Sequence, residues 1–199
     1  MSPSHPASPP FGLISGSLFS PDPSLELRLA GHCELQVPGP EAIVATGEVD
    51  LGESMRLLRF YLDDEDYWLQ VLMNGNEAGD IVLFGYHSAQ PVHGPAQVQR
   101  LVGDQAQSGL PIYVHDGYLY SRQWGREEGR APWVALHEQV FGPDGRYRIV
   151  HTSMLYARDT GLPDRREFLL LSLEEDERGA LTFTTSLGVT LFATDFHTA

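Results

Sequence analysis

The chain has 199 residues; all 13 of its cationic residues are Arg, 27 residues are Asp or Glu, and the formal net charge is −14. The absence of lysine excludes P-loop NTPases, Schiff-base enzymes and Ser–Lys dyads, because each of these needs a lysine amine. The negative charge opposes contact with phosphate backbones, so we expect no nucleic-acid partner.

Cysteine and hydropathy set two further limits. Cys33 is the only cysteine, which excludes an internal disulfide and any multi-cysteine metal site, and we interpret it as a small buried hydrophobe. The sequence shows no basic N-terminal leader and no apolar run near the ~20 residues that span a bilayer. We therefore expect a cytoplasmic protein without a transmembrane segment.

The first 24 residues are rich in proline and serine, and they lack a continuous apolar face. This composition predicts an N-terminal arm over residues 1–24. Residues 25–199 are then predicted to form a single antiparallel β-rich domain.

The domain begins with alternating segments. Apolar and polar residues alternate over residues 25–29 and 33–37, which predicts two short strands. A longer strand is expected over residues 41–51, with Gly47 as its bulge.

Two apolar runs then flank four consecutive acids, Asp63, Asp64, Glu65 and Asp66. A four-residue loop at these acids predicts a hairpin with one wholly apolar face, because loop length and side-chain alternation agree on one register. That face pairs Leu62 with Tyr67, Phe60 with Leu69, and Leu58 with Val71. The opposite face pairs Tyr61 with Trp68 and Arg59 with Gln70, and we expect it to be half wet.

The remainder of the chain also reads mainly as strands, joined by turns rich in glycine and acidic residues. The expected fold class is α+β, mainly β, with antiparallel sheets arranged as a meander and hairpins, about ten to twelve strands and one or two short helices. Strands are predicted over residues 80–86, 134–141, 147–157, 168–173, 181–185 and 189–192, and a short helix over residues 95–103, where Pro95 suits the first turn. The 168–173 strand is apolar on both faces, which indicates a central position.

The four acids of the hairpin loop are the first candidate site. The run lacks the glycine and the ligand spacing of an EF-hand, so we interpret it as a solvated hairpin tip whose charges discourage edge pairing. The alternative is a docking site for a basic protein partner through Asp63, Asp64, Glu65 and Asp66.

The second candidate site lies in the aromatic segment 111–133. Aromatic rings interleaved with arginines can stack on a partner or grip an anion. The local charges balance, which argues against nucleic acid. Three interpretations stay open, namely core plus loop, a small-ligand pocket, and a protein-binding patch built from Tyr118, Tyr120, Arg122, Trp124 and Arg126.

The histidines form no recognisable metal set, and we expect no metal and no cofactor. The segment from His137 to Phe141 starts like the zinc motif H-E-x-x-H but ends in Phe. His115, which precedes Asp116, and His151 remain candidates for a general base. No recognisable nucleophile motif accompanies either of them.

Several motifs resemble those of the bacterial YjfK-like family of unknown function. They comprise Val49 to Gly52 followed by Leu58 to Gln70, Gly109 to Pro111, Tyr120 to Trp124, Leu155 to Arg158 and Glu167 to Leu170. The resemblance covers roughly residues 25–195 and leaves the proline-rich start outside it. It implies a family without assigned activity or catalytic residues, and an accessory role beside membrane-stress proteins of the inner membrane.

Together these observations favour a non-enzymatic cytoplasmic interaction or adaptor module. Its expected partners are proteins, including proteins peripheral to the inner membrane. The competing hypothesis is a small-ligand-binding protein, or an unrecognised hydrolase that uses His115 or His151. A third alternative is a homo-oligomer formed by paired strand edges.

Overall fold

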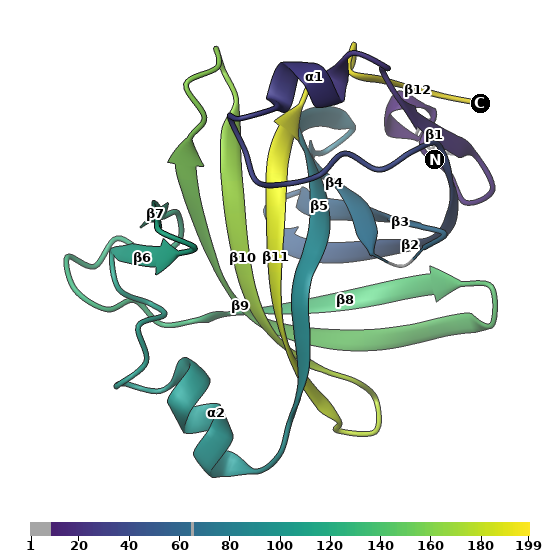
Figure 1. Cartoon of the computed structure of the whole chain (residues 1–199). Coiled ribbons are helices and arrows are strands. Elements are labelled where there is room, and N and C mark those ends of the chain that lie inside the picture. The colour runs from purple at the N-terminus through teal and green to yellow at the C-terminus, as the bar shows by residue number, and fades with distance from the viewer. Residues whose placement is uncertain (1–8, 65) are drawn as a thin grey trace.

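A computed structural model describes residues 9–64 and 66–199 of the chain (Figure 1). Glu65 and the first eight residues of the predicted arm lie outside the described residues. Among the described residues, antiparallel strands dominate, and the two α-helices are α1 (Leu25–Leu29) and α2 (Pro95–Val102). The predicted fold class, mainly β and antiparallel with short helices, is confirmed.

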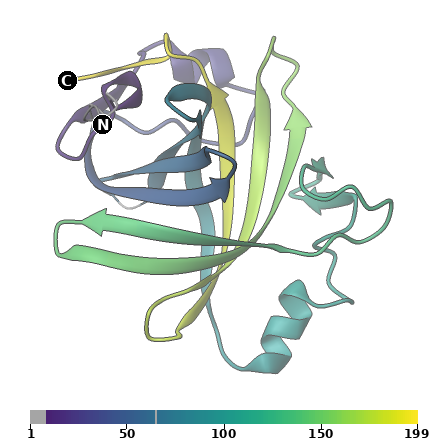
Figure 2. The same ribbon diagram turned by 180° about the vertical axis from the view of Figure 1, so that it is seen from behind.

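Eight of the strands close into a barrel, an arrangement more specific than the predicted meander and hairpins. Each strand is antiparallel to its neighbours, and β8 closes the ring because it pairs with both β2 and β9 (Figure 2). In order around the ring, the strands are β2 (Glu41–Gly52), β3 (Met55–Leu62), β4 (Tyr67–Asn74), β5 (Glu77–Val92), β11 (Leu181–Leu191), β10 (Arg166–Glu175), β9 (Gly145–Asp159) and β8 (Val134–Gly142).

The barrel consists of two meanders joined at both edges. Strands β2 to β5 form one meander and β8 to β11 the other, with β5 against β11 and β2 against β8. The contact between β2 and β8 joins residues 46–49 to residues 138–141, which are far apart in the sequence. Closure of the barrel therefore depends on a strand pairing that local sequence patterns do not predict.

Three further segments cover the outside of the barrel. The 3-10 helix η1 (Pro10–Gly12) and strand β1 (Leu18–Pro21) come from the predicted arm, and β1 pairs with β2 and with the C-terminal β12 (Phe196–Thr198). The connection from β5 to β8 carries α2 and the hairpin of β6 (Ile112–His115) and β7 (Tyr118–Arg122), which pairs with β9. Figure 1 shows α2, β6 and β7 on the left of the barrel and α1 at its top.

The outer coverings explain why several strands are buried on both faces. Leu13, Phe19 and Leu25, from the N-terminal segment, pack in one core cluster with outward-facing side chains such as Leu69 and Leu187. This cluster lies on the opposite side of the strands from the barrel interior. The predicted central strand is confirmed by β10, which is buried along most of its length between β9 and β11.

The register predicted for the acidic hairpin is confirmed at four positions. Phe60 pairs with Leu69, Leu58 with Val71, Tyr61 with Trp68, and Arg59 with Gln70. The expectation of a half-wet second face is wrong for part of it, since Arg59 and Trp68 are each 3% exposed. Barrel closure turns that face inward, which a hairpin considered alone cannot reveal.

The first two predicted strands are wrong. Residues 25–29 form α1, with Leu25 and Leu29 buried and Leu27 80% exposed. Five alternating residues also fit a helix, because positions i and i+4 share a helix face. Residues 33–37 run along the barrel without a ladder partner. They pack closely on β5, because a Cβ at Gly85 would meet the side chain of Leu35.

Smaller corrections concern bulges and strand ends. Gly47 pairs in regular register with Arg59, and the register shifts of β2 lie elsewhere, between Ile43 and Ala45 and between Asp50 and Gly52. The two predicted strands at residues 181–192 are one strand, β11. The helix expected at residues 95–103 is confirmed as α2. Neither α-helix within the described residues is long and apolar enough to cross a membrane.

Candidate functional site

A cavity of about 800 Å³ occupies one end of the barrel, and we call it the end cavity. It lies where β2 turns into β3 and where β9 connects to β10. Its apolar walls come from strands all around the ring, namely from Leu57, Leu72, Val82, Leu136, Leu155 and Phe168. Each of these side chains is on the inward face of its strand, as the pairing of Leu57 with Leu72 illustrates.

Trp124 closes one side of the end cavity. It packs against all three hydrophobic clusters of the described residues, and it lines the cavity together with Gln123 and Arg126. This loop follows β7 and is anchored to the barrel by a hydrogen bond from the backbone N–H of Gln123 to the carbonyl of Leu155, 2.8 Å long. The sequence-predicted residues Trp124 and Arg126 are therefore brought to a cavity wall.

The mouth of the end cavity combines exposed apolar side chains with balanced charges. Leu51 and Met55, in the β2–β3 hairpin, are 40% and 36% exposed. Two arginines and two aspartates complete the rim: Arg126, Arg166, Asp80 and Asp164. The Arg166 guanidinium donates a hydrogen bond of 2.7 Å to the Gln123 side chain, which ties the rim to the Trp124 loop.

Deeper in the barrel, charged side chains form what we call the interior network. Arg59 on β3 donates to the Glu138 carboxylate on β8 over 2.7 Å, and the His151 ring nitrogen Nε2 lies 2.6 Å from the same carboxylate oxygen. Tyr61 donates to the other Glu138 oxygen over 2.8 Å, and His151 Nδ1 lies 3.7 Å from Glu174. Strands β3 and β8 are not paired with each other but both pair with β2, so these contacts pass over the inward face of β2.

Burial and charge act in opposite directions on the pKa values of Glu138 and His151. Burial raises the pKa of Glu138, but the Arg59 charge and the hydrogen bonds from His151 and Tyr61 outweigh it and lower that pKa to about 2. Burial lowers the pKa of His151, yet its contacts with Glu138 and Glu174 raise it overall. The network is thus most stable with Glu138 ionised and His151 protonated.

The interior network is connected to the end cavity through Gln70. The Gln70 side chain lines the cavity, and its Oε1 accepts a hydrogen bond of 3.1 Å from Arg59 Nε. Its amide nitrogen is thereby left as a hydrogen-bond donor on a mostly apolar wall. A molecule in the cavity can therefore contact one polar group that is itself held by a buried ion pair.

Gly47 makes room for this network. A Cβ on Gly47 would lie 1.7 Å from Glu138 Oε1, so the carboxylate passes over β2 where no side chain intervenes. The glycine predicted as a bulge is instead a gap on the inward face of β2.

The two candidate histidines lie in separate environments, and neither lines the end cavity. His151 is 3% exposed inside the barrel, held between Glu138 and Glu174. His115 ends β6 on the outside, where its Nε2 lies 3.5 Å from Asp116.

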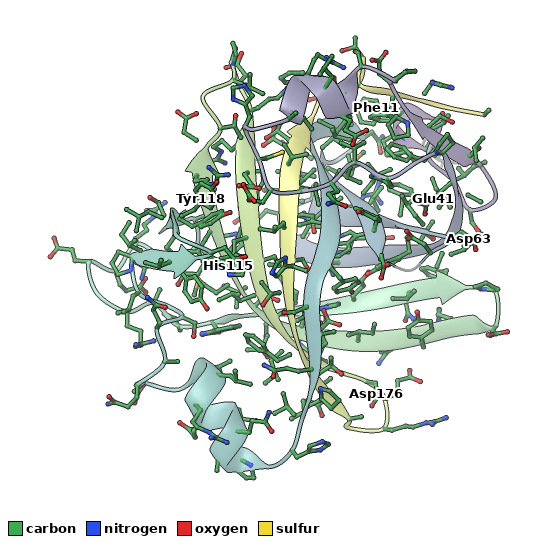
Figure 3. All side chains as sticks on the ribbon, viewed as in Figure 1. Phe11, Glu41, Asp63, His115, Tyr118 and Asp176 are labelled. Carbon is green, nitrogen blue, oxygen red and sulfur yellow. The ribbon has the colours of Figure 1, made fainter. Side chains whose placement is uncertain are left out.

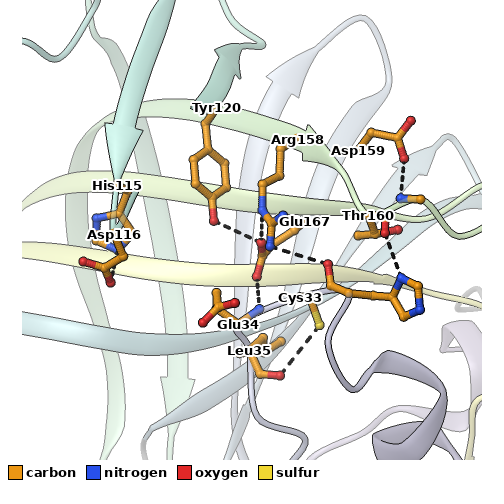
Figure 4. A network of polar contacts seen from close by, with 12 residues as sticks. Cys33, Glu34, Leu35, His115, Asp116, Tyr120, Arg158, Asp159, Thr160 and Glu167 are labelled. Carbon is orange, nitrogen blue, oxygen red and sulfur yellow. Dashed lines mark hydrogen bonds and ion pairs between the residues drawn. The ribbon is translucent and has the colours of Figure 1, made fainter. Parts of the chain in front are cut away.

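The predicted residues Tyr118 and Tyr120 belong to a second polar network on the outer face of the barrel. Figure 4 shows Tyr120, Arg158 and Glu167 at the centre of this network. Tyr120 is 0% exposed and donates to the Glu167 carboxylate over 3.0 Å, and Arg158 pairs with the same carboxylate. The Arg158 guanidinium also stacks 4.0 Å from the centre of the Tyr118 ring. The backbone N–H of Glu34 binds the remaining Glu167 oxygen, which anchors the segment that follows α1.

Arg122 holds its own loop together. Its guanidinium donates to the backbone carbonyls of Gly109, Gly129 and Glu127. The aromatic and arginine residues of segment 111–133 therefore divide among three environments. These are the cavity wall, the Glu167 network, and the hydrogen bonds by which Arg122 holds its own loop. Alternation and composition in the sequence do not distinguish these environments.

The acidic loop lies at the opposite end of the barrel from the end cavity. Asp63, Asp64 and Asp66 are exposed, and Asp64 Oδ1 accepts the backbone N–H of Asp66 over 2.9 Å. Glu41 lies beside the loop (Figure 3), and both its burial and the neighbouring aspartates raise its pKa. The structure thus adds Glu41 to the acidic cluster predicted from the sequence.

Family comparison covers nearly the whole chain. Residues 2–197 match the model of a family described as protein of unknown function, DUF2491. The chain belongs to this family. The uncharacterised family that the sequence resemblance implied is thereby confirmed at that level, and the match extends into the proline-rich start that the resemblance left outside. No curated protein and no solved structure matches this DUF2491 member.

Proposed function

We propose that this DUF2491 member binds one small apolar molecule in the end cavity. The observation that carries the proposal is the pocket itself, about 800 Å³ in volume, walled by aliphatic and aromatic side chains and open at one barrel end. Ligand pockets typically measure about 300–1,000 Å³ and often lie in the mouths of β-barrels. This is the ligand-binding alternative to the adaptor role.

The charge at the mouth favours an uncharged ligand. Two arginines and two aspartates line the rim, so their charges balance and a charged molecule gains little net attraction there. Within the cavity, Gln70 offers one polar contact among apolar walls. A molecule with an apolar body and at most one hydrogen-bonding group fits this arrangement.

The experiment is a fluorescence titration with N-phenyl-1-naphthylamine, an uncharged apolar probe that brightens in apolar surroundings. We expect saturable binding of one probe per chain, with energy transfer from Trp124 in the cavity wall. Trp124→Phe should reduce that transfer and retain the probe's own brightening.

A space-filling variant makes the test specific. Leu72→Trp fills the cavity and should weaken probe binding at least about tenfold, a loss of about 1.4 kcal/mol. Leu27→Trp introduces the same side chain at a position that is 80% exposed on α1, and it should bind like the native protein. No saturable binding in the native chain, or equal binding in Leu72→Trp, would overturn the proposal.

A second candidate function is docking of a basic protein segment at the acidic loop. Repulsion from Asp64 and Asp63 contributes to the raised pKa of Glu41, so a cationic partner would relieve an unfavourable concentration of charge there. The test compares binding of an arginine-rich peptide by the native chain and by the double variant Asp63→Asn with Asp64→Asn. Equal binding by the two proteins would refute this candidate function. We also propose protein partners peripheral to the inner membrane, a cytoplasmic location and membership of a YjfK-like subgroup.

A further inference from the structure

Three metal-ligating side chains meet outside the barrel, away from the end cavity. His87 comes from β5, His115 from the end of β6, and Asp116 from the turn after it. One ligand atom of each lies within 4.8 Å of the others. The Asp116 carboxylate oxygen Oδ2 lies 3.5 Å from the Nε2 atoms of both histidines.

The turn that holds Asp116 is well determined by its sequence. Asp116 and Gly117 both have positive φ, 47° and 84°, as the two central residues of a type I′ hairpin turn require. Asp-Gly is a favoured pair for this turn. The tight β6–β7 hairpin thus presents His115 and Asp116 together toward His87.

The spacing matches a small transition-metal ion. Zinc binds imidazole nitrogen at about 2.0–2.1 Å and carboxylate oxygen at about 2.0–2.2 Å in tetrahedral geometry, which separates neighbouring ligand atoms by about 3.3–3.5 Å. Two of the three separations in the cluster already have that length. Two imidazoles and one carboxylate are also a donor set suited to zinc and its neighbours in the first transition row.

A second, independent observation is that the His115 ring has a buried nitrogen without a hydrogen-bond partner among the described residues. Its Nε2 is buried from solvent and makes no hydrogen bond to any described residue. A cavity of about 320 Å³ adjoins the cluster, lined by His87 and Asp116 together with Glu34 and Tyr86, and it provides space for a further ligand.

The geometry points to a divalent transition-metal site formed by His87, His115 and Asp116. Three protein ligands leave one coordination position open toward the adjoining cavity, as in zinc sites that bind water or a small molecule. The net charge of −14 increases the local concentration of divalent cations around the chain.

The test is a zinc titration of the full chain, prepared without a histidine tag and stripped with a chelator, in competition with a chromogenic indicator. We expect one zinc ion per chain. His87→Ala and Asp116→Asn should each weaken binding at least about tenfold, since even indirect partners of a metal contribute about 10–100-fold. Asparagine tolerates the positive φ at position 116, so the second variant preserves the turn.

His93→Ala is the matched control, because His93 is an exposed histidine beyond the cluster in the same connection, and it should bind zinc like the native chain. Cobalt(II) gives a second readout, with visible absorption bands expected in the native chain and in His93→Ala only. Native affinity no tighter than that of His87→Ala, or an equal loss in His93→Ala, would overturn the inference. Unchanged circular dichroism in each variant separates loss of the site from loss of the fold.

Discussion

At the residue scale, Glu138 has the most demanding environment of the interior network. It is 1% exposed and accepts hydrogen bonds from Arg59 and Tyr61 while also contacting His151. A buried charge of this kind is tolerated because both of its oxygens have partners. Its neighbours depend on it in turn, since Arg59 is 3% exposed and has no other carboxylate within ion-pair distance among the described residues.

Replacement of Glu138 by Gln should therefore destabilise the fold strongly. The expected loss in the free energy of unfolding is about 3–5 kcal/mol, because Arg59 would retain a buried charge without a counter-ion. Urea denaturation followed by circular dichroism measures it.

The control removes both charges. Arg59→Met combined with Glu138→Leu should be more stable than Glu138→Gln alone, because it removes the arginine charge that the single variant leaves buried without a counter-ion. A loss in the free energy of unfolding below about 1 kcal/mol for Glu138→Gln would show that water or rearranged side chains compensate the buried charge of Arg59.

At the element scale, the inward face of β2 is shaped by the absence of one side chain. Gly47 faces the interior between Arg59 on β3 and Val140 on β8, and the Glu138 carboxylate occupies the space in which its Cβ would lie. A β-strand usually loses stability through an interior glycine. Here the glycine permits an ion pair to cross the strand.

Gly47→Ala is expected to destabilise the protein, although alanine is the better residue for an ordinary strand. The new Cβ would displace Glu138, whose carboxylate cannot move without breaking its contacts with Arg59 and Tyr61. The thermal midpoint should fall by about 4 °C or more, since 1 kcal/mol shifts the midpoint of a chain this size by about 2–4 °C.

Gly39→Ala serves as the comparison, because a Cβ at Gly39 meets nothing within 4 Å. Its midpoint should match that of the native chain within about 1–2 °C. Equal midpoints for the Gly47 and Gly39 variants would contradict the assigned role of Gly47.

At the scale of the whole molecule, the interior network predicts how stability varies with pH. The folded-state pKa of Glu138 lies near 2, below its ordinary 4.5, so its contribution is present above pH 4.5 and is lost as pH falls toward 2. The folded-state pKa of His151 lies above its ordinary 6.5, so its contribution is present below pH 6.5 and is lost as pH rises through the folded value.

The free energy of unfolding should therefore be greatest between about pH 4.5 and pH 6.5. The sequence pI of about 4.8 acts in the same direction, because repulsion among surface acids grows above it. Urea midpoints from pH 3 to pH 9 test the profile. Above pH 6.5 the urea midpoint of His151→Asn should decline less steeply than that of the native chain. Equal declines in the two proteins would exclude His151 as a cause of the pH dependence.

Local patterns in the sequence determined much of the strand content. Alternation and loop length predicted the four confirmed pairs of the acidic hairpin, and Pro95 predicted the first turn of α2. These features succeed because the interacting residues are near one another in the chain. Residues 25–29 failed because five alternating positions satisfy both strand and helix spacing.

Only the tertiary structure decided which surfaces face inward and which distant residues meet. Closure of β2 against β8 made the Arg59 side of the hairpin an interior, created the end cavity and placed Trp124 in its wall. The same folding brought His87 to His115 and Asp116. The physical reason is that a strand pattern specifies alternation between two faces, whereas pairing of segments about ninety residues apart specifies which face is enclosed.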